Sequence, residues 1–328
     1  MSELALAAFA AATESHVVSA PANQRFRAFE RSFDASAYLK GLAERGVRWL
    51  GRSEARFPTL LRAIHDPPPG LFLRGEAADG MLDGPAVALV GARACSPYGA
   101  QVARTLGREL AAAGLVVVSG LARGVDGEAH RGALEAGGRT VAVLGCGIDR
   151  DYPAAHASLA SRIRASGLVV SEYAPGIEPA PWRFPARNRI IAGLSRATVL
   201  VEARERSGAL ITADLALEEG REVFAVPGEI TSRLSAGTNE LLRLGAAPAT
   251  SARDVLESFG LEPAEPAAPQ LGPLGRQIHE RLRDGPLAAD ELVRVTGIPV
   301  SDLAVALTEL ELSGVIAEAE GLYRVVVP

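Results

Sequence analysis

The chain is poor in cysteine and has almost no lysine. Its two cysteines, Cys95 and Cys146, give neither a disulfide framework nor the spacing of a metal site, so we expect two reduced, buried thiols. Lys40 is the single lysine among 34 basic residues. Arginine suits bidentate contact with phosphate, but a genome rich in G and C produces the same bias, so composition alone does not decide between the two causes.

Long apolar runs are also missing. No segment is long enough to cross a bilayer, and the apolar stretch at residues 4–9 is short and has no basic flank. We therefore expect a helix there rather than a signal peptide, and a cytoplasmic protein with no membrane partner. At 328 residues the chain is long enough for one large core with one or two small modules.

Several motifs of nucleotide-binding and metal enzymes are absent. No Gly-x-Gly-x-x-Gly follows the first strand of the expected core, and no Walker A motif occurs; the nearest sequence, Gly145-Cys146-Gly147, is followed by no lysine. The five histidines are scattered without the spacing of metal ligands. The sequence thus gives little support to an ATPase or a metalloenzyme, and we expect no cofactor.

The net charge of −5 argues by itself against a nucleic-acid partner, but the charge is unevenly distributed. Residues 87–250 carry 18 arginines and 16 acidic residues, a net charge of +2. Residues 271–328 carry five basic and nine acidic residues, a net charge of −4. The basic excess is small and lies in the middle of the chain.

From residue 86 onward, apolar runs alternate with helical patterns. Near-continuous apolar strands separated by helices indicate a parallel sheet that is covered on both faces. We therefore predict an α/β fold with an extended Rossmann-like, doubly wound, mainly parallel sheet. The strands are expected at residues 86–90, 115–119, 140–144, 168–171, 198–201 and 223–226, and the helices between them at 99–113, 127–136, 154–165 and 209–219.

The remaining segments predict smaller modules on either side of this core. Residues 1–55 are expected to form a small N-terminal helical module, for which a SAM-like arrangement is one option. The core then covers residues 56–260 and begins with a short helix, a triple proline and a strand. Residues 261–270 form a proline-rich linker, and residues 271–328 contain three helices and a hairpin, the pattern of a winged-helix domain.

Three segments of the core combine arginine with glycine, small hydroxyl or aromatic residues where a strand ends or a helix begins. Ligands and free backbone N–H groups gather at the carboxyl ends of parallel strands, so we expect an anion-binding surface there. No nucleophile with an adjacent base accompanies these segments, which favours binding over catalysis. The segments contain Gly91-Ala92-Arg93 with Ser96, Ser119-Gly120 with Arg123 and Gly124, and Phe184 with Arg187, Asn188 and Arg189.

Each segment also has a purely structural interpretation. Arg93 could be a solvated arginine in an ordinary strand-to-helix turn. Asp126 is expected to cap the next helix and His130, one turn later, to contact it as a brace. Residues 182–189 interleave aromatics with three arginines, a composition typical of single-stranded nucleic-acid binding, although these arginines could instead pair with Glu172 or with Glu202.

Two later loops add candidate backbone donors. Ser207 and Gly208 open another helix and offer a further seat for a phosphate. Gly228, Thr238 and Asn239 belong to a long loop after the last expected strand. That loop either supplies donors to the same surface or has no ligand.

Taken together, these motifs resemble those of the DprA/Smf family, the DNA-processing proteins of bacterial natural transformation. The resemblance runs from about residue 57 to the C-terminus, and Ala92 departs from the usual serine. It implies a non-enzymatic core that binds single-stranded DNA in a basic pocket, forms a homodimer and loads RecA onto the strand. The matching blocks are residues 91–93, 119–126 with His130, 184–191, 207–212, 226–228 and 237–239; by this match Arg93, Ser119, Arg123, Phe184, Arg187, Asn188 and Arg189 fall in the DNA-pocket motifs.

Two other classes of function compete with this hypothesis. A nucleotide phosphoribohydrolase can use a related Rossmann core, but Val226-Pro227-Gly228 continues with Glu229 and lacks the glycine-rich loop of such enzymes. A transcriptional regulator would read DNA with the winged helix, whose third helix carries three acidic and no basic residues over 301–311. We therefore expect the winged helix to contact protein rather than to bind DNA strongly.

Overall fold

The computed structural model describes residues 2–13, 24–263, 271–319 and 321–325. The chain divides into two compact units, Met1–Ala264 and Glu265–Pro328. Within the described residues, every helix is too short or too polar to span a bilayer. Most of the predicted linker, residues 264–270 of 261–270, lies outside the described residues.

The first unit is built on a nine-stranded sheet in the order β1-β2-β6-β5-β4-β3-β7-β8-β9. The strands from β6 to β9 in this order pair in parallel, whereas β1 and β2 form an antiparallel edge. All six strands predicted from the apolar runs are present, and the predicted α/β fold class is confirmed. The bounds are β1 Arg48–Gly51, β2 Gly70–Arg74, β3 Ala86–Val90, β4 Val116–Ser119, β5 Thr140–Val143, β6 Leu168–Ser171, β7 Ala197–Leu200, β8 Glu222–Ala225 and β9 Ala247–Pro248.

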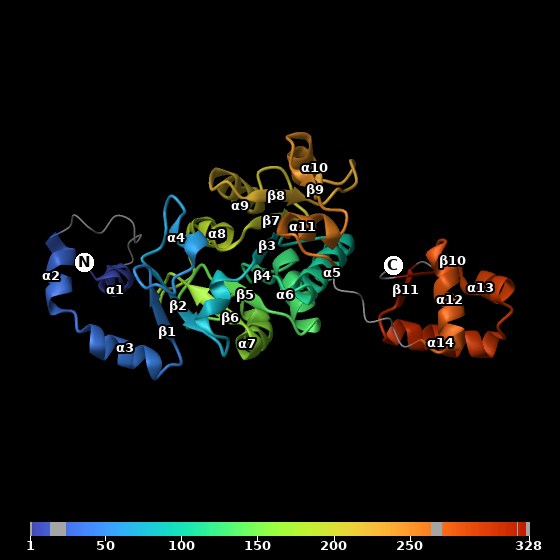
Figure 1. The fold of residues 1–328 in the computed structure, drawn as a ribbon, viewed down its shortest axis with the longest axis horizontal. Helices are drawn as coiled ribbons and strands as arrows, with labels where there is room; N and C mark the ends of the chain where they lie inside the picture. Colours follow the sequence, from blue (N-terminus) through green and yellow to red (C-terminus); the bar gives the residue numbers. More distant parts are fainter. Residues whose placement is uncertain (1, 14–23, 264–270, 320, 326–328) are drawn as a thin grey trace. The chain divides into compact units, whose positions relative to one another are not determined.

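Helices cover both faces of this sheet, which explains why the central strands are apolar on both sides (Figure 1). On one face α4, α8, α9 and α10 pack on alternate strand residues such as Val118 and Val141. On the other face α5, α6 and α11 pack on Val87 and Val117, and α7 packs on Ala142. The helices are α4 Thr59–Arg62, α5 Pro97–Ala112, α6 Val125–Glu135, α7 Ala157–Ser166, α8 Arg183–Leu194, α9 Gly208–Glu218, α10 Ala236–Arg243 and α11 Ala252–Phe259.

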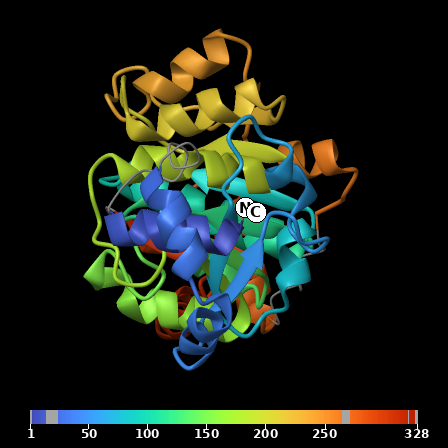
Figure 2. The ribbon, with the colours of Figure 1, turned by 90° about the vertical axis from the view of Figure 1, so that its left-hand side faces the viewer.

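The N-terminal segment forms helices α1 Glu3–Thr13, α2 Gln24–Ser32 and α3 Ala35–Ala43 and then enters the sheet as β1. The predicted N-terminal module extends to residue 55, whereas β1 within it pairs with β2 along its whole length. Helix α1 also packs on the sheet, because its Leu4 lies in the same apolar cluster as Phe72 of β2. Figure 2 shows these N-terminal helices beside the edge of the sheet.

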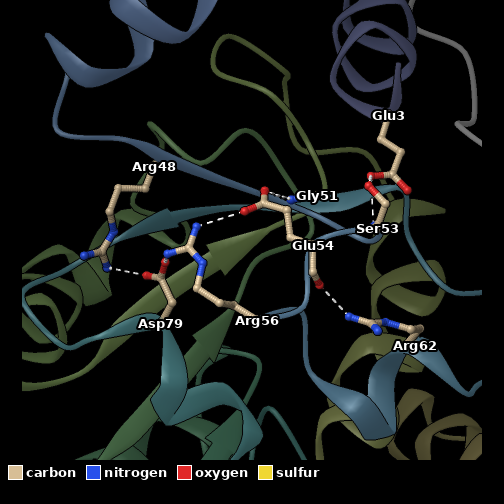
Figure 3. Close-up of polar contacts among 8 residues, drawn as sticks. All are labelled: Glu3, Arg48, Gly51, Ser53, Glu54, Arg56, Arg62 and Asp79. Carbon is tan, nitrogen blue, oxygen red and sulfur yellow. Dashed lines mark hydrogen bonds and ion pairs between the residues drawn. The ribbon is translucent and has the colours of Figure 1, made fainter. Parts of the chain in front are cut away.

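Polar contacts fasten this edge of the sheet to neighbouring segments (Figure 3). The Glu3 carboxylate of α1 accepts hydrogen bonds from the Ser53 hydroxyl at 2.9 Å and from its N–H at 3.1 Å. The Glu54 carboxylate pairs with Arg56 at 2.9 Å, and Arg56 also donates to Asp79 at 3.1 Å. These contacts join α1, the β1–β2 connection and the segment before β3.

The second unit contains three helices and a small antiparallel sheet in the order β10-β12-β11. Ile278, Leu292, Leu303 and Leu307 are buried at its centre. The predicted winged helix is confirmed, with one short extra strand, β10. Its elements are α12 Pro273–Arg283, β10 Leu287–Ala288, α13 Ala289–Thr296, α14 Val300–Leu312, β11 Ile316–Ala319 and β12 Leu322–Val325.

Helices α5 and α6 pack so closely that glycine is required at their contact. A Cβ added to Gly132 of α6 would overlap the carbonyl oxygen of Arg104 in α5. We expect Gly132→Ala to lower the free energy of unfolding by about 1–3 kcal/mol because the two backbones must separate. Chemical denaturation of the full chain measures this loss.

Gly41 in α3 provides the matched control, because nothing lies within 4 Å of its added Cβ. Gly41→Ala should leave the stability unchanged or raise it by about 0.5–1 kcal/mol, since alanine is the better helix former. Equal stability of Gly132→Ala and the wild type would contradict the close packing of α5 on α6.

Candidate nucleic-acid interface

Two adjoining hollows lie where strands β3, β4 and β5 end and where α8 and α9 begin. The larger, which we call the Ser207 hollow, has a volume of about 520 Å³ and includes Asn188, Arg204 and Ser207 in its lining. The smaller, the Tyr152 hollow, has a volume of about 200 Å³ and includes Arg123 and Tyr152. Four residues line both hollows and so form a shared wall: Arg93, Ala122, Phe184 and Arg187.

The turn after β3 brings Arg93 to this wall. Gly91 has to be small, because an added Cβ would lie 2.9 Å from the carbonyl oxygen of Glu202 and 2.7 Å from Val125. Ser96 caps α5 by accepting the Gly99 N–H at 3.0 Å, so helix α5 begins directly after the turn. Arg93 itself is exposed.

Arg93 stands in a row with two aromatic rings. Its guanidinium carbon lies 5.2 Å from the centre of the Phe184 ring, and Phe184 stacks on Tyr152 with ring centres 5.4 Å apart and planes inclined by 24°. Tyr152 is not among the predicted binding residues. The only feature of the sequence that points to it is its position shortly after Gly147, in the segment that follows β5. The row offers a cation and flat apolar surfaces side by side.

Arg187 is the buried member of the wall, with 4% of its surface exposed. Its Nη1 donates to the carbonyl oxygens of Gly120, at 2.9 Å, and of Val143. Among the described residues Nη2 has no hydrogen-bond partner, and no carboxylate lies within ion-pair distance of the guanidinium. Burial lowers the pKa of Arg187 to about 10, an effect that the nearby Asp126 carboxylate partly offsets.

Asp126, in the first turn of α6, lies near Arg187 and holds the loop before this helix. Its carboxylate accepts the backbone N–H of Gly120 at 3.1 Å and that of Ala122 at 3.3 Å. Burial raises the pKa of Asp126, whereas the charge of Arg187 and these two hydrogen bonds oppose that rise. Gly120 has no room for a side chain, because a Cβ would lie 2.6 Å from Arg187 Nη2.

The structure brings most of the predicted binding residues together. Gly124 shapes the loop that carries Arg123, since its φ of +73° suits glycine. The Ser96 hydroxyl accepts the Gly99 N–H and donates to the Glu202 carboxylate. Arg204, which sequence analysis did not select, adds a further exposed cation to the Ser207 hollow. The predicted residues that line the hollows are Arg93, Gly120, Arg123, Phe184, Arg187, Asn188, Ser207 and Gly208.

Arg189 and Ser119 have internal partners instead. The guanidinium of Arg189 forms two hydrogen bonds with the buried Glu172 carboxylate, at 2.8 and 2.7 Å, and its Nε donates to the carboxylate of Asp66 at 3.0 Å and to its carbonyl oxygen at 2.9 Å. The buried Ser119 hydroxyl donates to the Leu89 carbonyl oxygen at 2.6 Å. The side chains of Arg189 and Ser119 are therefore engaged within the fold, and their contact with DNA stays a prediction.

The predicted loop residues Gly228, Thr238 and Asn239 also hold the fold together. The Asn239 side-chain amide accepts the Gly228 N–H at 3.2 Å and donates to the Gly228 carbonyl oxygen at 3.0 Å. The buried Thr238 hydroxyl donates to the carbonyl oxygen of Ser235. None of the three lines either hollow. These bonds brace the loop, and contact of the three residues with DNA stays a prediction.

The predicted contact between Asp126 and His130 is absent as well. His130 is buried and its Nδ1 lies 2.7 Å from the Thr140 hydroxyl, which donates to Val117. Burial lowers the pKa of His130 to about 3, so the ring is neutral at physiological pH. The contact between His130 and Thr140 of β5 holds α6 against the sheet. The Asp126 carboxylate instead binds the backbone of the loop before α6.

Geometry and fold define a class: a Rossmann-type core with arginine-lined hollows, and a winged helix. The chain matches the family model of DNA recombination-mediator protein A over residues 48–260 and that of the DprA winged helix domain over residues 262–321. The chain therefore belongs to the DNA recombination-mediator protein A family, and the resemblance seen in the sequence is confirmed. This membership supports the recombination-mediator hypothesis and not the phosphoribohydrolase alternative.

Individual relatives agree with this assignment. The chain is 48% identical to the DNA processing protein DprA of Streptococcus pneumoniae over 207 residues, covering 62% of this chain and 71% of that protein. It is 39% identical to protein Smf of Escherichia coli over 312 residues, covering 92% of this chain and 83% of that protein.

Two solved structures are similar as well. The X-ray structure of DprA from S. pneumoniae has a TM-score of 0.66 and 38% identity, covering 78% of this chain and 92% of that chain. The structure of DNA processing protein A from Helicobacter pylori, described for its single-stranded DNA binding mode, has a TM-score of 0.59 and 33% identity. It covers 65% of this chain and 95% of that chain.

The buried pair of Arg189 and Glu172 yields a test of its structural role. We expect Glu172→Gln to lower the free energy of unfolding by about 3–5 kcal/mol, because the Arg189 guanidinium loses its buried partner and keeps only the more exposed Asp66 carboxylate. Replacing both residues together, as Arg189→Met with Glu172→Leu, should recover most of that loss, since no uncompensated charge remains.

The double variant also separates structure from ligand contact. If Arg189 only supports the fold, this variant should bind single-stranded DNA within about twofold of the wild type, because no phosphate contact is lost. A stable double variant with a tenfold loss of affinity would restore Arg189 to the binding surface. Denaturation and fluorescence anisotropy on the same preparations provide both readouts.

Proposed function

We propose that this protein is a non-enzymatic cytoplasmic mediator that binds single-stranded DNA in the two hollows and hands the strand to RecA. The arrangement that carries the proposal is the shared wall, where the exposed Arg93 and the Phe184 ring stand beside the buried Arg187. The single-stranded DNA binding mode described for the H. pylori relative supports the same ligand.

Phosphates of the strand are held by the arginines around the hollows. Arg93 and Arg123 are exposed and can move to a phosphate, whereas Arg187 is already fixed by Gly120 and Val143. The fixed Arg187 guanidinium, with its unbonded Nη2, favours the binding of an anion, because no carboxylate of the described residues forms an ion pair with it. Contacts of this kind bind any sequence with similar strength.

Bases stack on the aromatic part of the wall. Phe184 and Tyr152 present neighbouring rings, and every base has a face that can stack on such a surface. Duplex DNA keeps its bases stacked inside the helix, so this contact selects unpaired strands. Phosphate binding and stacking together give preference for single strands without sequence reading.

A homodimer and the transfer to RecA complete the proposal. One site of this size in each protomer holds a short stretch of strand, and two linked sites on one strand bind it more tightly than either alone. Leu241 of α10 is buried in the core, whereas Leu244, directly after this helix, is 71% exposed. We therefore assign the dimer contact to Leu244 and its surroundings, and leave the winged helix, with its net negative charge, for protein partners.

Removing the Arg93 charge tests the phosphate contacts. Arg93→Ala should weaken binding of all single-stranded sequences alike and should reduce the slope of log affinity against log salt by about 1. Arg253→Ala, an exposed arginine on α11 away from both hollows, is the matched control and should change neither quantity. Equal behaviour of the two variants would remove Arg93 from the binding site.

Removing the Phe184 ring tests the stacking contact. Phe184→Leu keeps an apolar side chain against Gly145 but cannot stack on a base, so the free energy of binding should weaken by about 1–3 kcal/mol, roughly five- to 150-fold in affinity. Phe184→Tyr keeps the ring and should bind like the wild type. Equal affinities of the leucine and tyrosine variants, measured by anisotropy with oligothymidine, would exclude stacking on Phe184.

A further inference from the structure

The Ser207 hollow reaches beyond the shared wall and differs from the rest of the groove. Past Phe184 it is lined by Asn188, Arg204, Ser207 and Leu234. The Leu234 carbonyl oxygen accepts the Ala203 N–H at 2.8 Å, which fastens the loop after β8 at this end of the hollow. Its volume of about 520 Å³ lies within the range of sites for small molecules, roughly 300–1,000 Å³.

Helix α9 opens into this hollow without a cap. Ser207 occupies the N-cap position with an extended backbone, yet its side chain makes no capping hydrogen bond. Its Oγ is buried and has no hydrogen-bond partner among the described residues. By contrast, the Ser96 hydroxyl caps α5 by accepting the Gly99 N–H at 3.0 Å. The N–H groups of Gly208 and Ala209 and the Ser207 hydroxyl therefore have no hydrogen-bond partner among the described residues, whereas the Leu210 N–H donates to the Ser207 carbonyl oxygen at 3.1 Å.

Buried Arg187 is a second, independent sign of a ligand in the same hollow. It is 4% exposed, it lines the hollow, and its Nη2 has no hydrogen-bond partner in the described part of the chain. The charged lining comprises three arginines, Arg93, Arg187 and Arg204, against the single carboxylate Asp126, a net charge of +2. A phosphate diester carries one negative charge, whereas a phosphate monoester carries about −1.5 to −2 near pH 7 and matches this lining better.

We propose that the Ser207 hollow binds a nucleoside that carries a phosphate monoester. The phosphate lies on the first turn of α9, where it accepts hydrogen bonds from the Ser207 hydroxyl and the backbone N–H groups, and it pairs with Arg204. The nucleoside lies toward Phe184 and Ile191. This proposal rests on the proposed function, because the same wall holds the internal phosphates of the strand. The ligand is either the phosphorylated end of a DNA strand or a free mononucleotide.

The test compares DNA strands that differ only in their ends. Three oligothymidines of twenty nucleotides, each with an internal fluorophore, carry a 5′-phosphate, a 3′-phosphate or hydroxyls at both ends. Their affinities for the full-length protein are measured at one salt concentration. We expect one terminal phosphate to raise affinity about five- to tenfold over the hydroxyl strand, because it adds charge-assisted hydrogen bonds at a helix N-terminus. Thymidine monophosphate, titrated alone by calorimetry, tests the free nucleotide.

Ser207→Asp removes the site while preserving the helix. Aspartate is a preferred N-cap, so it should satisfy the first turn of α9 and repel the phosphate. We expect this variant to lose the gain from the terminal phosphate or the binding of thymidine monophosphate, whichever the wild type shows. Arg204→Ala should reduce the same gain. Ser251→Asp makes the same chemical change at the N-cap of α11, outside the hollow, and should retain it.

The outcomes separate this proposal from the proposed function. A gain from either terminal phosphate that disappears in Ser207→Asp and persists in Ser251→Asp supports the strand end as the ligand. Calorimetric binding of thymidine monophosphate with the same dependence on Ser207 supports the free nucleotide. Equal affinities for all three strands with no binding of thymidine monophosphate would overturn the proposal, as would a gain that survives in Ser207→Asp. Failure of the wild type to bind the hydroxyl strand would instead count against the proposed function.

Discussion

The site depends on one buried positive charge that the protein does not neutralise by direct contact. Arg187 is held by the carbonyl oxygens of Gly120 and Val143, and Asp126 acts on it through space while bonding to the loop backbone. Burying a guanidinium in this way has a cost that a bound anion would offset. The glycine at position 120 and the position of Asp126 serve to keep this group in place.

The geometry of α8 assigns different tasks to its charged residues. Phe184, Arg187, Asn188 and Ile191 are spaced by three and four residues, so they share one side of the helix and all line the Ser207 hollow. Arg189 lies on another side and pairs with the buried Glu172. One short motif thus supplies both the ligand surface and the ion pair that fixes the helix on the sheet.

The sequence predicted the core of the fold well, because apolar runs and helical patterns alternate regularly from residue 86. It did not predict β1, since four residues with a single apolar pair are too few to show a strand pattern. Turn motifs located the site, with Arg93, Arg187 and Ser207 among the residues that meet there. The sequence could not distinguish an arginine that faces a hollow from one that faces a carboxylate distant in the chain.

Tyr152 and Arg204 line the hollows but could not be predicted from the sequence. Neither residue belongs to the turn motifs from which the sequence predicts the binding surface. Each reaches the hollows only because parallel strands end at the same edge of the sheet. Conversely, Thr238 and Asn239 stand in a loop with the composition of a binding loop but brace it internally. Residue type indicated the chemistry, and the packing decided which residues perform it.

The salt dependence of binding tests the central claim most directly. The affinity of the full chain for circular single-stranded DNA, which has no ends, should be measured over a series of salt concentrations beside duplex DNA. If the arginines around the two hollows neutralise three to four phosphates, log affinity should fall with log salt at a slope of about −2 to −3, with weaker binding of duplex. A slope near zero would contradict the account, because the arginines would then bind no phosphate.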